Sequence, residues 1–155
     1  MTTSGAALSS KVQVGYVEIR VFAHATEDPE RVLTAIRNIL PKESIDTVTY
    51  KKADLTGHHG NPIILYETKI KEKKTVQAAF QKLCSGLSVL DKEILANEVQ
   101  QHMDKGNLYV RLDKQSAYLN ELKLSSADPI HLRIHFKKHS EEEVLGVCRG
   151  SGLLP

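Results

Sequence analysis

The chain has 155 residues, of which 41% are apolar and 26% are charged, and its formal net charge is +2. A chain of this length fits one compact domain, and no apolar run approaches the ~20 residues that cross a bilayer, which excludes a membrane protein. The small net charge is no argument for nucleic-acid binding by itself, so any such argument depends on where the basic residues lie.

Both ends of the chain and its cysteines bear on organisation and compartment. Residues 1–10 lack the basic start and continuous apolar stretch of a secretory signal, and predict a disordered lead to a single domain over residues 11–149. Residues 150–155 predict a loose tail. Cys84 and Cys148 lie far apart without metal-ligand spacing, which predicts free thiols, no disulfide and no zinc site. These features predict a cytoplasmic protein.

The first predicted element is a strand over residues 11–24, where inward and outward side chains alternate. Its inward positions are Val17, Ile19, Val21 and Ala23. The segment Thr26-Glu27-Asp28-Pro29-Glu30 then predicts the start of a helix, because it offers a capping side chain, a proline suited to the first turn and acids favoured by the helix dipole. The helix carries its apolar stripe to Leu40 and ends before Pro41.

A hairpin is predicted next. Residues 45–52 and 63–71 are rich in strand-forming side chains. Between them, residues 56–62 hold glycine, asparagine and proline, which allow tight or left-handed turns. This loop also carries two adjacent histidines.

Two further helices are predicted after Lys74, with Gly86 at the break between them. The first carries apolar residues at helical spacing, namely Val76, Ala79, Phe80 and Leu83. The second begins at Ser88, whose hydroxyl caps its first turn, and carries Met103 on its apolar side. Gly106 is predicted to stop this helix.

Alternation returns over residues 107–113 and 130–137, which predict a fourth and a fifth strand. A short, partly helical connection is predicted over residues 114–124, and Ser140 with Glu143 makes a capping box for a last helix. Strands and helices alternate irregularly. The predicted fold class is therefore α+β, with a mixed, largely antiparallel sheet of about five strands and helices packed on one face.

The most informative feature is the strand over residues 130–137, whose outward positions hold four nitrogen-rich side chains at strand period. They are His131, Arg133, His135 and Lys137. If the first and fourth strands are its neighbours, this row widens into a face that mixes rings with guanidinium groups. The added residues are Arg20, Phe22, His24, Tyr109 and Arg111.

Such a face predicts RNA binding, because rings and guanidinium planes stack on unpaired bases while Arg and Lys contact phosphates. The alternative is an ordinary solvated sheet face, whose charges prevent edge-to-edge aggregation. The choice depends on whether the three strands are adjacent, which the sequence does not determine.

Two further groups are candidates for contact with an RNA backbone or another anion. The first is a set of lysines at the predicted hairpin: Lys69 and Lys71, with Lys73, Lys74, Lys51 and Lys52. Its alternative is a solvated hairpin end. The second is the loop at residues 57–62, where His58, His59 and backbone N–H groups would face an anion, although any tight connection uses the same residue types.

Neither a metal site nor a catalytic centre is predicted, and no cofactor is implied. His131 and His135 share a face but lie about 13 Å apart along the strand, too far for one ion with bonds near ~2 Å. Glu27 and Asp28 are accounted for by capping and by the dipole of the helix that follows them. No Gly-x-Ser-x-Gly elbow or local pairing of Cys with His is present, so the protein is predicted not to be an enzyme.

Two other functions stay open as alternatives. A small phosphate-handling hydrolase would use the imidazoles of His24, His58 and His59 as acid or base, and this requires the three side chains to converge in one pocket. A protein–protein assembly module would instead expose an apolar patch.

Five segments, in order, carry a resemblance to a known family. They are His24-Ala-Thr-Glu-Asp-Pro-Glu30, Arg37-Asn-Ile-Leu-Pro41, Gly57-His-His-Gly-Asn-Pro-Ile63, Leu112-Asp-Lys-Gln115 and Asp128-Pro-Ile-His-Leu-Arg-Ile-His-Phe136. From about Val14 to Lys138 the sequence resembles the archaeal RNA-binding family described as predicted exosome subunits. The resemblance implies an α+β fold similar to that of a ribosomal protein of the large subunit.

The resemblance also implies a non-catalytic RNA-binding protein, an accessory factor of RNA processing or degradation or of ribosome assembly. The partners that it implies are RNA, single-stranded or structured, and exosome or ribosomal components, and a homodimer stays open. It supplies no catalytic residues, so the candidate residues are those of the sheet face, the histidine loop and the lysine cluster.

Overall fold

The computed structural model describes residues 14–137 and 140–155, which form a six-stranded sheet with the strand order β2-β3-β1-β6-β5-β4. The strands are β1 (Val14–Ala23), β2 (Lys51–Thr56), β3 (Pro62–Ile70), β4 (Met103–Asp104), β5 (Asn107–Leu112) and β6 (Ile130–Phe136). Every neighbouring pair is antiparallel. The predicted α+β class is confirmed, and the sheet has one short strand, β4, more than the five that were expected.

Five α-helices occur in the described part of the chain, with three short 3-10 turns between elements. The helices are α2 (Pro29–Ile39), α3 (Lys73–Gly86), α4 (Val89–Glu98), α5 (Lys114–Tyr118) and α6 (Glu141–Ser151). The turns are η1 (Lys42–Ser44), η2 (His58–Gly60) and η3 (Val99–His102). None of these helices is long and apolar enough to cross a membrane.

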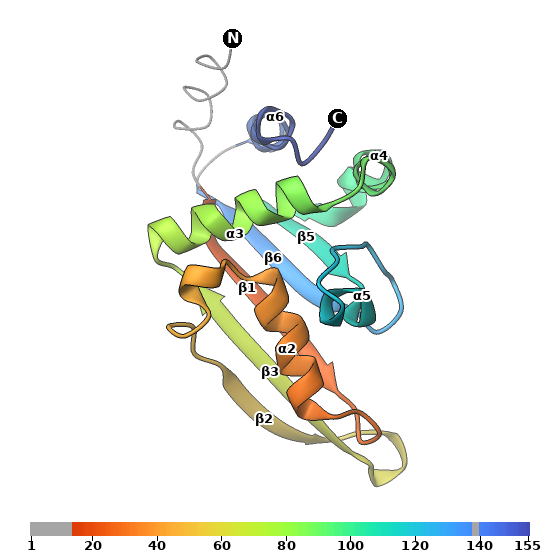
Figure 1. Ribbon diagram of the computed structural model, residues 1–155. Coiled ribbons are helices and arrows are strands. Elements are labelled where there is room, and N and C mark those ends of the chain that lie inside the picture. The colour runs from red at the N-terminus through yellow and green to blue at the C-terminus, as the bar shows by residue number, and fades with distance from the viewer. Residues whose placement is uncertain (1–13, 138–139) are drawn as a thin grey trace.

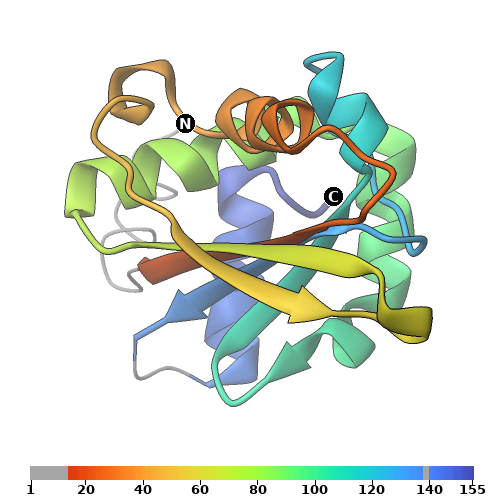
Figure 2. The same cartoon turned by 90° about the horizontal axis from the view of Figure 1, so that it is seen from below.

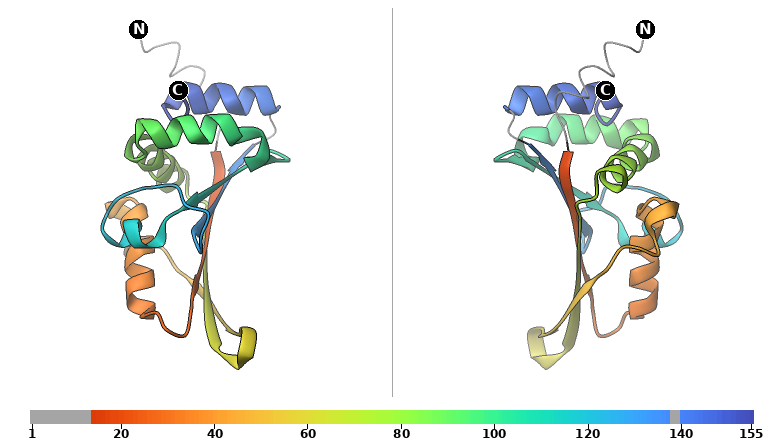
Figure 3. Two further views of the ribbon diagram at one scale, coloured as in Figure 1. Left: turned by 90° about the vertical axis from the view of Figure 1, so that its right-hand side faces the viewer. Right: turned by 90° about the vertical axis from the view of Figure 1, so that its left-hand side faces the viewer.

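The helices leave one face of the sheet open. Figure 3 shows the sheet edge-on, with α2, α3 and α5 on one side and no helix over the centre of the other. Helices α4 and α6 lie at one end of the sheet, while the β2–β3 hairpin extends beyond the helices at the opposite end (Figures 1 and 2). We call the uncovered side of the sheet the open face.

The alternation in the sequence explains which side of each strand is covered. In β1, Val17, Ile19 and Val21 are at most 2% exposed and face the helices. Helix α3 packs Phe80 against Phe136 of β6, with the two rings edge to face and their centroids 5.9 Å apart. Burying such side chains contributes about 1.5–3 kcal/mol each relative to an exposed position, so the helix layer fixes the direction of the opposite, polar side chains.

The capping predictions are confirmed at three helices, one of them α4, where the Ser88 hydroxyl accepts from the Asp91 backbone N–H. The Asp28 carboxylate accepts from the backbone N–H of Glu30 at the start of α2, beside Pro29 in the first turn. At α6, the Ser140 hydroxyl accepts from the Glu143 backbone N–H, and the Glu143 carboxylate accepts from the backbone N–H of Ser140. Such caps satisfy N–H groups that have no partner inside the helix.

The predicted strand at residues 45–52 is wrong over most of its length. Strand β2 begins only at Lys51 and continues to Thr56. Before it, Val48 and Tyr50 pack against the core without a paired neighbour strand, and the Thr49 carbonyl accepts from the Thr68 hydroxyl at 2.6 Å. The β-branched residues in this run are there for packing, which strand propensity alone does not distinguish from pairing.

The predicted extent of the helix from Ser88 is also wrong. Helix α4 ends at Glu98, and Met103 lies in β4. Lys105 and Gly106 have φ values of 51° and 81°, so they form the turn of a two-residue hairpin between β4 and β5. Gly106 therefore closes a hairpin and does not stop a helix.

The end of the chain differs from the predicted loose tail over residues 150–155. Helix α6 continues to Ser151, and Gly152, with φ of 88°, caps it in the left-handed conformation. This reversal returns Leu153 and Leu154 to the core, where they are 0% and 4% exposed. The predicted disordered lead at residues 1–10 lies outside the described residues.

Both cysteines are buried free thiols. Burial, together with the nearby Cys84, raises the pKa of the Cys148 thiol to about 12, and burial also raises the pKa of Cys84. Such thiols are poor nucleophiles because the reactive form is the thiolate.

Candidate nucleic-acid interface

The sheet order places β1, β6 and β5 side by side, which is the arrangement that the RNA-binding prediction required. Arg20, His131 and Arg111 are register partners across these strands. In the next row Glu18 pairs with Arg133, which pairs with Tyr109. Partners in register point to the same side of a sheet, so these side chains share the open face.

The charge of the open face is moderately positive. Its outward positions hold five basic residues, which are Lys51, Lys69, Arg20, Arg111 and Arg133, and three carboxylates, which are Glu18, Glu67 and Asp104. Lys71 and Lys137 are exposed directly after β3 and β6. The face is thus basic without being a block of unbalanced charge.

Arg20 and Arg111 differ in what they contact. The Arg20 Nε lies 3.2 Å from the Glu67 carboxylate in an exposed ion pair. Arg111 is exposed and takes part in none of the ion pairs among residues 14–137 and 140–155. Burial, and then the neighbouring Arg111 and Arg20, lower the pKa of His131 between them. This row therefore has positive potential that its own carboxylates do not cancel.

Tyr16 of β1 is the centre of a second group on the open face. The Lys69 ammonium lies 4.1 Å from the centroid of its ring, and the His135 ring is stacked on it with centroids 4.7 Å apart and planes 16° from parallel. The Tyr16 hydroxyl accepts from the Arg133 guanidinium at 2.5 Å. Cation–π and charge-assisted contacts of this kind hold flexible cationic side chains in one position.

Further contacts tie this group to Asn107 of β5 and to Glu18 of β1. His135 Nδ1 is 2.8 Å from the Asn107 side-chain oxygen, and Arg133 also approaches Glu18 at 3.6 Å. Burial, and then Arg133 and Lys69, lower the pKa of His135. Gly15 provides the space, because a Cβ there would lie 3.2 Å from the His135 ring and 3.1 Å from the Lys137 side chain.

The two candidate stacking rings lie toward the margins of the open face. Phe22 is half-buried near the end of β1, in register with Leu65 of β3. Tyr109 is half-buried and lines a hollow of about 400 Å³ together with Ile94 of α4. Strand register places seven of the predicted residues on the open face, namely Arg20, Phe22, Tyr109, Arg111, His131, Arg133 and His135. His24 lies beyond the end of β1 and Lys137 beyond the end of β6. The central ring of the face is Tyr16, which was not among the predicted residues.

The histidine loop forms a separate site at the tip of the β2–β3 hairpin. His58 and His59 have ring centroids 5.8 Å apart, and both line a hollow of about 380 Å³ with His24. The three histidines that the hydrolase alternative requires therefore line one hollow. One nitrogen of His24, Nε2, is however already 3.0 Å from an Asp128 carboxylate oxygen.

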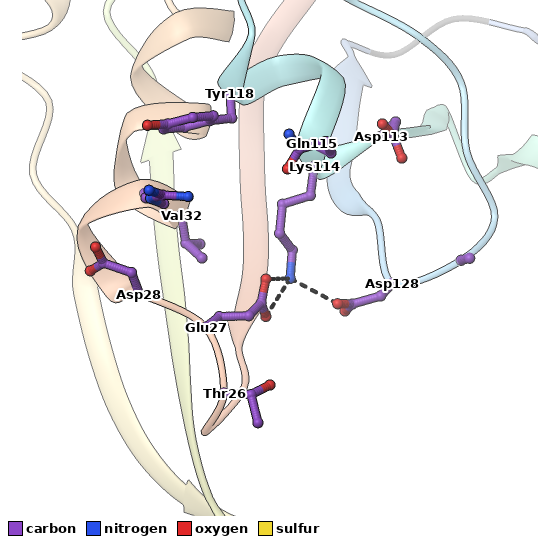
Figure 4. A pocket seen from close by; sticks show the side chains of 11 residues that line it. Thr26, Glu27, Asp28, Val32, Asp113, Lys114, Gln115, Tyr118 and Asp128 are labelled. Atoms are coloured by element: carbon purple, nitrogen blue, oxygen red, sulfur yellow. Dashed lines mark hydrogen bonds and ion pairs between the residues drawn. The ribbon is translucent and has the colours of Figure 1, made fainter.

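A larger hollow, of about 540 Å³, lies between the start of α2, α5 and the segment before β6 (Figure 4). At its centre the Lys114 ammonium donates to the Phe22 carbonyl at 2.7 Å, to Glu27 at 3.0 Å and to Asp128 at 2.9 Å. The Lys114 side chain is only 12% exposed. We call Lys114, Glu27, Asp128 and His24 the lysine clamp.

The clamp contains the one group among the described residues with a metal-ligand arrangement. Ligand atoms of His24, Glu27 and Asp128 all lie within 4.8 Å of one another. The Lys114 ammonium already bonds both carboxylates, so it supplies the positive charge that a metal ion would bring. Burial would raise the pKa of Asp128, but the bonds from Lys114 and His24 lower it overall.

Three chain segments meet in the clamp: residues 24–30, 112–115 and 128–136, each of which carries part of the family resemblance. The sequence analysis attributed Glu27 to helix capping, and this is incorrect, because Asp28 is the cap and Glu27 accepts from the His24 N–H and from Lys114. No local pattern marked Lys114 or Asp128, since their partners lie up to 104 residues away.

An antiparallel sheet with one helix-covered face and one open basic face defines an α+β protein whose exposed surface suits an extended polyanion. Residues 16–136 match the family described as RNA binding, and the chain belongs to this family.

Two archaeal relatives and a solved structure resemble most of the chain. An RNA-binding protein of Pyrococcus abyssi is 38% identical over 133 residues, which cover 84% of this chain and 86% of that protein. An uncharacterized protein of Methanocaldococcus jannaschii is 30% identical over 137 residues, covering 83% and 91%. The DUF54 protein Mth689 of Methanothermobacter thermautotrophicus has the same fold, with a TM-score of 0.72 at 24% identity over 92% of this chain and 98% of its own.

Proposed function

We propose that this protein is a non-catalytic RNA-binding protein that holds RNA against the open face, as a cytoplasmic accessory factor of RNA processing or degradation or of ribosome assembly. The observation that carries the proposal is Arg111. Its exposed guanidinium stands beside His131, with Arg20 on the other side of that histidine, and has no ion-pair partner in the described part of the chain. Family membership supports RNA as the polyanion.

The proposed contacts are electrostatic. Arg111, Arg20 and Lys51 would neutralise phosphates, and each contact releases a condensed counterion from the RNA. The logarithm of the affinity should therefore fall with the logarithm of salt concentration, by roughly 0.7 per phosphate contact on a single strand. A small set of such contacts gives binding that weakens markedly between low and physiological salt.

The test is RNA binding of matched variants across a salt series. Lys51 and Lys52 are exposed neighbours on β2, but Lys51 is in register with Glu67 of the open face, whereas Lys52 is in register with the buried Tyr66. Lys51→Ala and Lys52→Ala thus remove the same charge from opposite sides of one strand. We expect Lys51→Ala and Arg111→Ala to weaken binding and reduce the salt slope, while Lys52→Ala leaves both near wild type.

Other outcomes would change the assignment. If the two lysine variants weaken binding equally, the site is not the open face, and the lysines at residues 71–74, beyond the end of β3, become the next candidates. If no RNA binds to the wild-type protein at any salt concentration, the proposal fails.

A second candidate function, binding of a protein partner, has its own observation. Helix α4 exposes Val89 at 74%, Leu90 at 66% and Ile94 at 39%, on a helix at the end of the sheet. Exposed apolar side chains grouped in this way favour a protein contact. The partner proposed is an exosome or ribosomal component, or a second copy of this chain. Light scattering of wild type and Leu90→Asp tests the homodimer, and binding of each to a reconstituted archaeal exosome tests the other partner.

A further inference from the structure

The open face lacks what a single-strand platform needs, which is a series of uncovered rings. The Tyr16 ring is in contact with side chains from the two flanking strands, Lys69 of β3 at 4.1 Å from the ring centroid and the stacked His135 of β6 at 4.7 Å. A base can stack on this ring only after one of the two contacts is broken. Platforms for unpaired bases instead present free ring faces, and each stacked base contributes about 1–3 kcal/mol.

The other two rings do not replace Tyr16. Phe22 is half-buried opposite Leu65, and Tyr109 is half-buried in the hollow beside α4. Tyr109 is two strands away from β1, and Phe22 is six residues from Tyr16 along it, about 20 Å at ~3.3 Å per residue. Successive unpaired bases therefore find no adjacent Tyr or Phe ring faces in the described part of the sheet.

The contacts around Tyr16 hold cations and hydrogen-bonding groups in fixed positions across a broad, shallow surface. Lys69 and Arg133 are held by the ring and hydroxyl of Tyr16, and His135 by the ring and by Asn107. Fixed donors lose little side-chain entropy when an anion binds. They match a rigid ligand whose phosphates are also fixed in position.

We infer that the open face binds base-paired RNA, by contacts to its phosphates and 2′-hydroxyls, in preference to single strands, with Tyr16 as a positioning residue. This inference rests on the proposed function and names the class of RNA. The minor groove of an A-form helix is wide and shallow and displays 2′-hydroxyls, so a broad polar surface can reach it. Bases within the helix are stacked on one another and need no ring from the protein.

The first experiment compares four ligands of one sequence at ~0.15 M salt: an RNA duplex of about 16 base pairs, one of its strands, that strand with abasic positions, and the DNA duplex. The length follows the span over which double-stranded RNA is commonly recognised. We expect the RNA duplex to bind at least about tenfold more tightly than the single strand and the DNA duplex. The abasic positions should leave the single-strand affinity unchanged within about twofold, because no base is stacked.

Two results would overturn the inference while leaving the proposed function intact. One is tighter binding of the single strand than of the duplex, and the other is a single-strand affinity that falls when bases are removed. Absence of binding to all four ligands would instead overturn the proposed function itself.

The second experiment uses Lys69→Ala, which uncovers one face of the Tyr16 ring, and Tyr16→Phe, which keeps the ring but removes the hydroxyl that Arg133 donates to. Lys69→Ala should weaken duplex binding about tenfold or less, as loss of one phosphate contact would, and should raise the ratio of single-strand to duplex affinity. Tyr16→Phe should weaken duplex binding alone. If Tyr16 stacked bases in the native protein, Tyr16→Phe would be neutral, because phenylalanine keeps the ring. A ratio left unchanged by Lys69→Ala would contradict the inference that this lysine keeps bases off the ring.

Discussion

The open face and the lysine clamp are both built from charged side chains, but they satisfy those charges to different degrees. In the clamp, Lys114 directs its ammonium at three acceptors on three chain segments and is almost buried. On the open face, Arg111 is exposed and has no ion pair among the described residues, and Arg20 shares only Glu67. A charged group whose hydrogen bonds and ion pairs are all made within the protein stabilises the fold, whereas a charged group without such partners is available to a ligand.

The largest expected effect is on stability, at the clamp. Lys114→Met keeps most of the apolar stem but leaves the Glu27 and Asp128 carboxylates and the Phe22 carbonyl without their donor. Removing one partner of such a network leaves charges uncompensated, so the free energy of unfolding should fall by about 3 kcal/mol. Urea unfolding measures this change. Arg111→Met is the matched control and should lie within about 0.5 kcal/mol of wild type, because surface charges without partners contribute little.

The clamp variant also tests the metal question. In the native protein the ligand atoms of His24, Glu27 and Asp128 lie within 4.8 Å of one another, and Lys114→Met removes the ammonium that bonds both carboxylates. We expect Zn²⁺ to raise the melting temperature of Lys114→Met but not that of the wild-type protein, since the lysine charge excludes a second cation from this space. A wild-type protein that is equally stabilised by Zn²⁺ would contradict the view that Lys114 occupies the site.

The second effect in size is on RNA affinity, at the open face. Arg20→Ala together with Arg111→Ala removes the two guanidinium groups that flank His131. Affinity should fall about tenfold to a hundredfold at low salt, with the salt slope reduced by roughly 1.4 to 1.8 for two lost phosphate contacts. Filter binding or fluorescence anisotropy across a salt series gives both quantities. An unchanged slope would mean that these arginines do not contact phosphate.

Sequence patterns predicted the open face better than the clamp, and the reason is the range of the interactions. Alternation in a strand fixes the side to which Arg20, Arg111 or His131 points, because side chains alternate with period two. Whether those strands are neighbours is a property of the whole sheet, and only the strand order in the structure shows that β1, β6 and β5 lie side by side. Tyr16 was missed because its importance comes from Lys69 and His135 on the flanking strands, which no local pattern shows.

Short and terminal elements were also not predicted from the sequence. Strand β4 has two residues, and the turn at Lys105 and Gly106 that forms it was attributed to the end of a helix, since glycine is used at both places. At the other end, Gly152 reverses the chain so that Leu153 returns to the core. The two adjacent leucines after a helix were the available signal, because apolar residues are uncommon in a solvated tail.

A third, smaller effect is a pH dependence that has opposite signs for folding stability and for RNA affinity. His131 and His135 have pKa values lowered by burial and then by their basic neighbours, Arg111 and Arg20 for His131, with Asp128 opposing, and Arg133 and Lys69 for His135. The folded protein therefore binds protons less readily than the unfolded chain, whose histidines have the ordinary value of about 6.5. Stability should be full above pH ~7 and should fall as the pH drops from about 6.5 toward the lowered folded-state values.

RNA binding should respond in the opposite direction. A phosphate beside either imidazole favours its charged form, so the complex takes up protons and affinity rises as the pH falls from about 7 to 5.5. Urea midpoints and RNA affinities at pH 7.5 and 5.5 test both statements, with His131→Gln as the comparison. The glutamine variant should lose less stability on acidification and gain less affinity; an unchanged pH dependence of affinity would place the phosphates away from His131.

The smallest expected effect tests how the cations near Tyr16 are positioned. A Cβ at residue 15 would lie 3.1 Å from Lys137 Cγ and 3.2 Å from the His135 ring, so Gly15→Ala needs both side chains to shift by a few tenths of an ångström. Exposed Lys137 can move freely, but His135 is held between Tyr16 and Asn107. We expect a loss of at most about 1 kcal/mol in stability and a loss of duplex RNA affinity of about twofold to fivefold. Equal weakening of duplex and single-strand binding would show that the His135–Tyr16 stack does not select between them, and would leave the selection to Lys69 and Arg133.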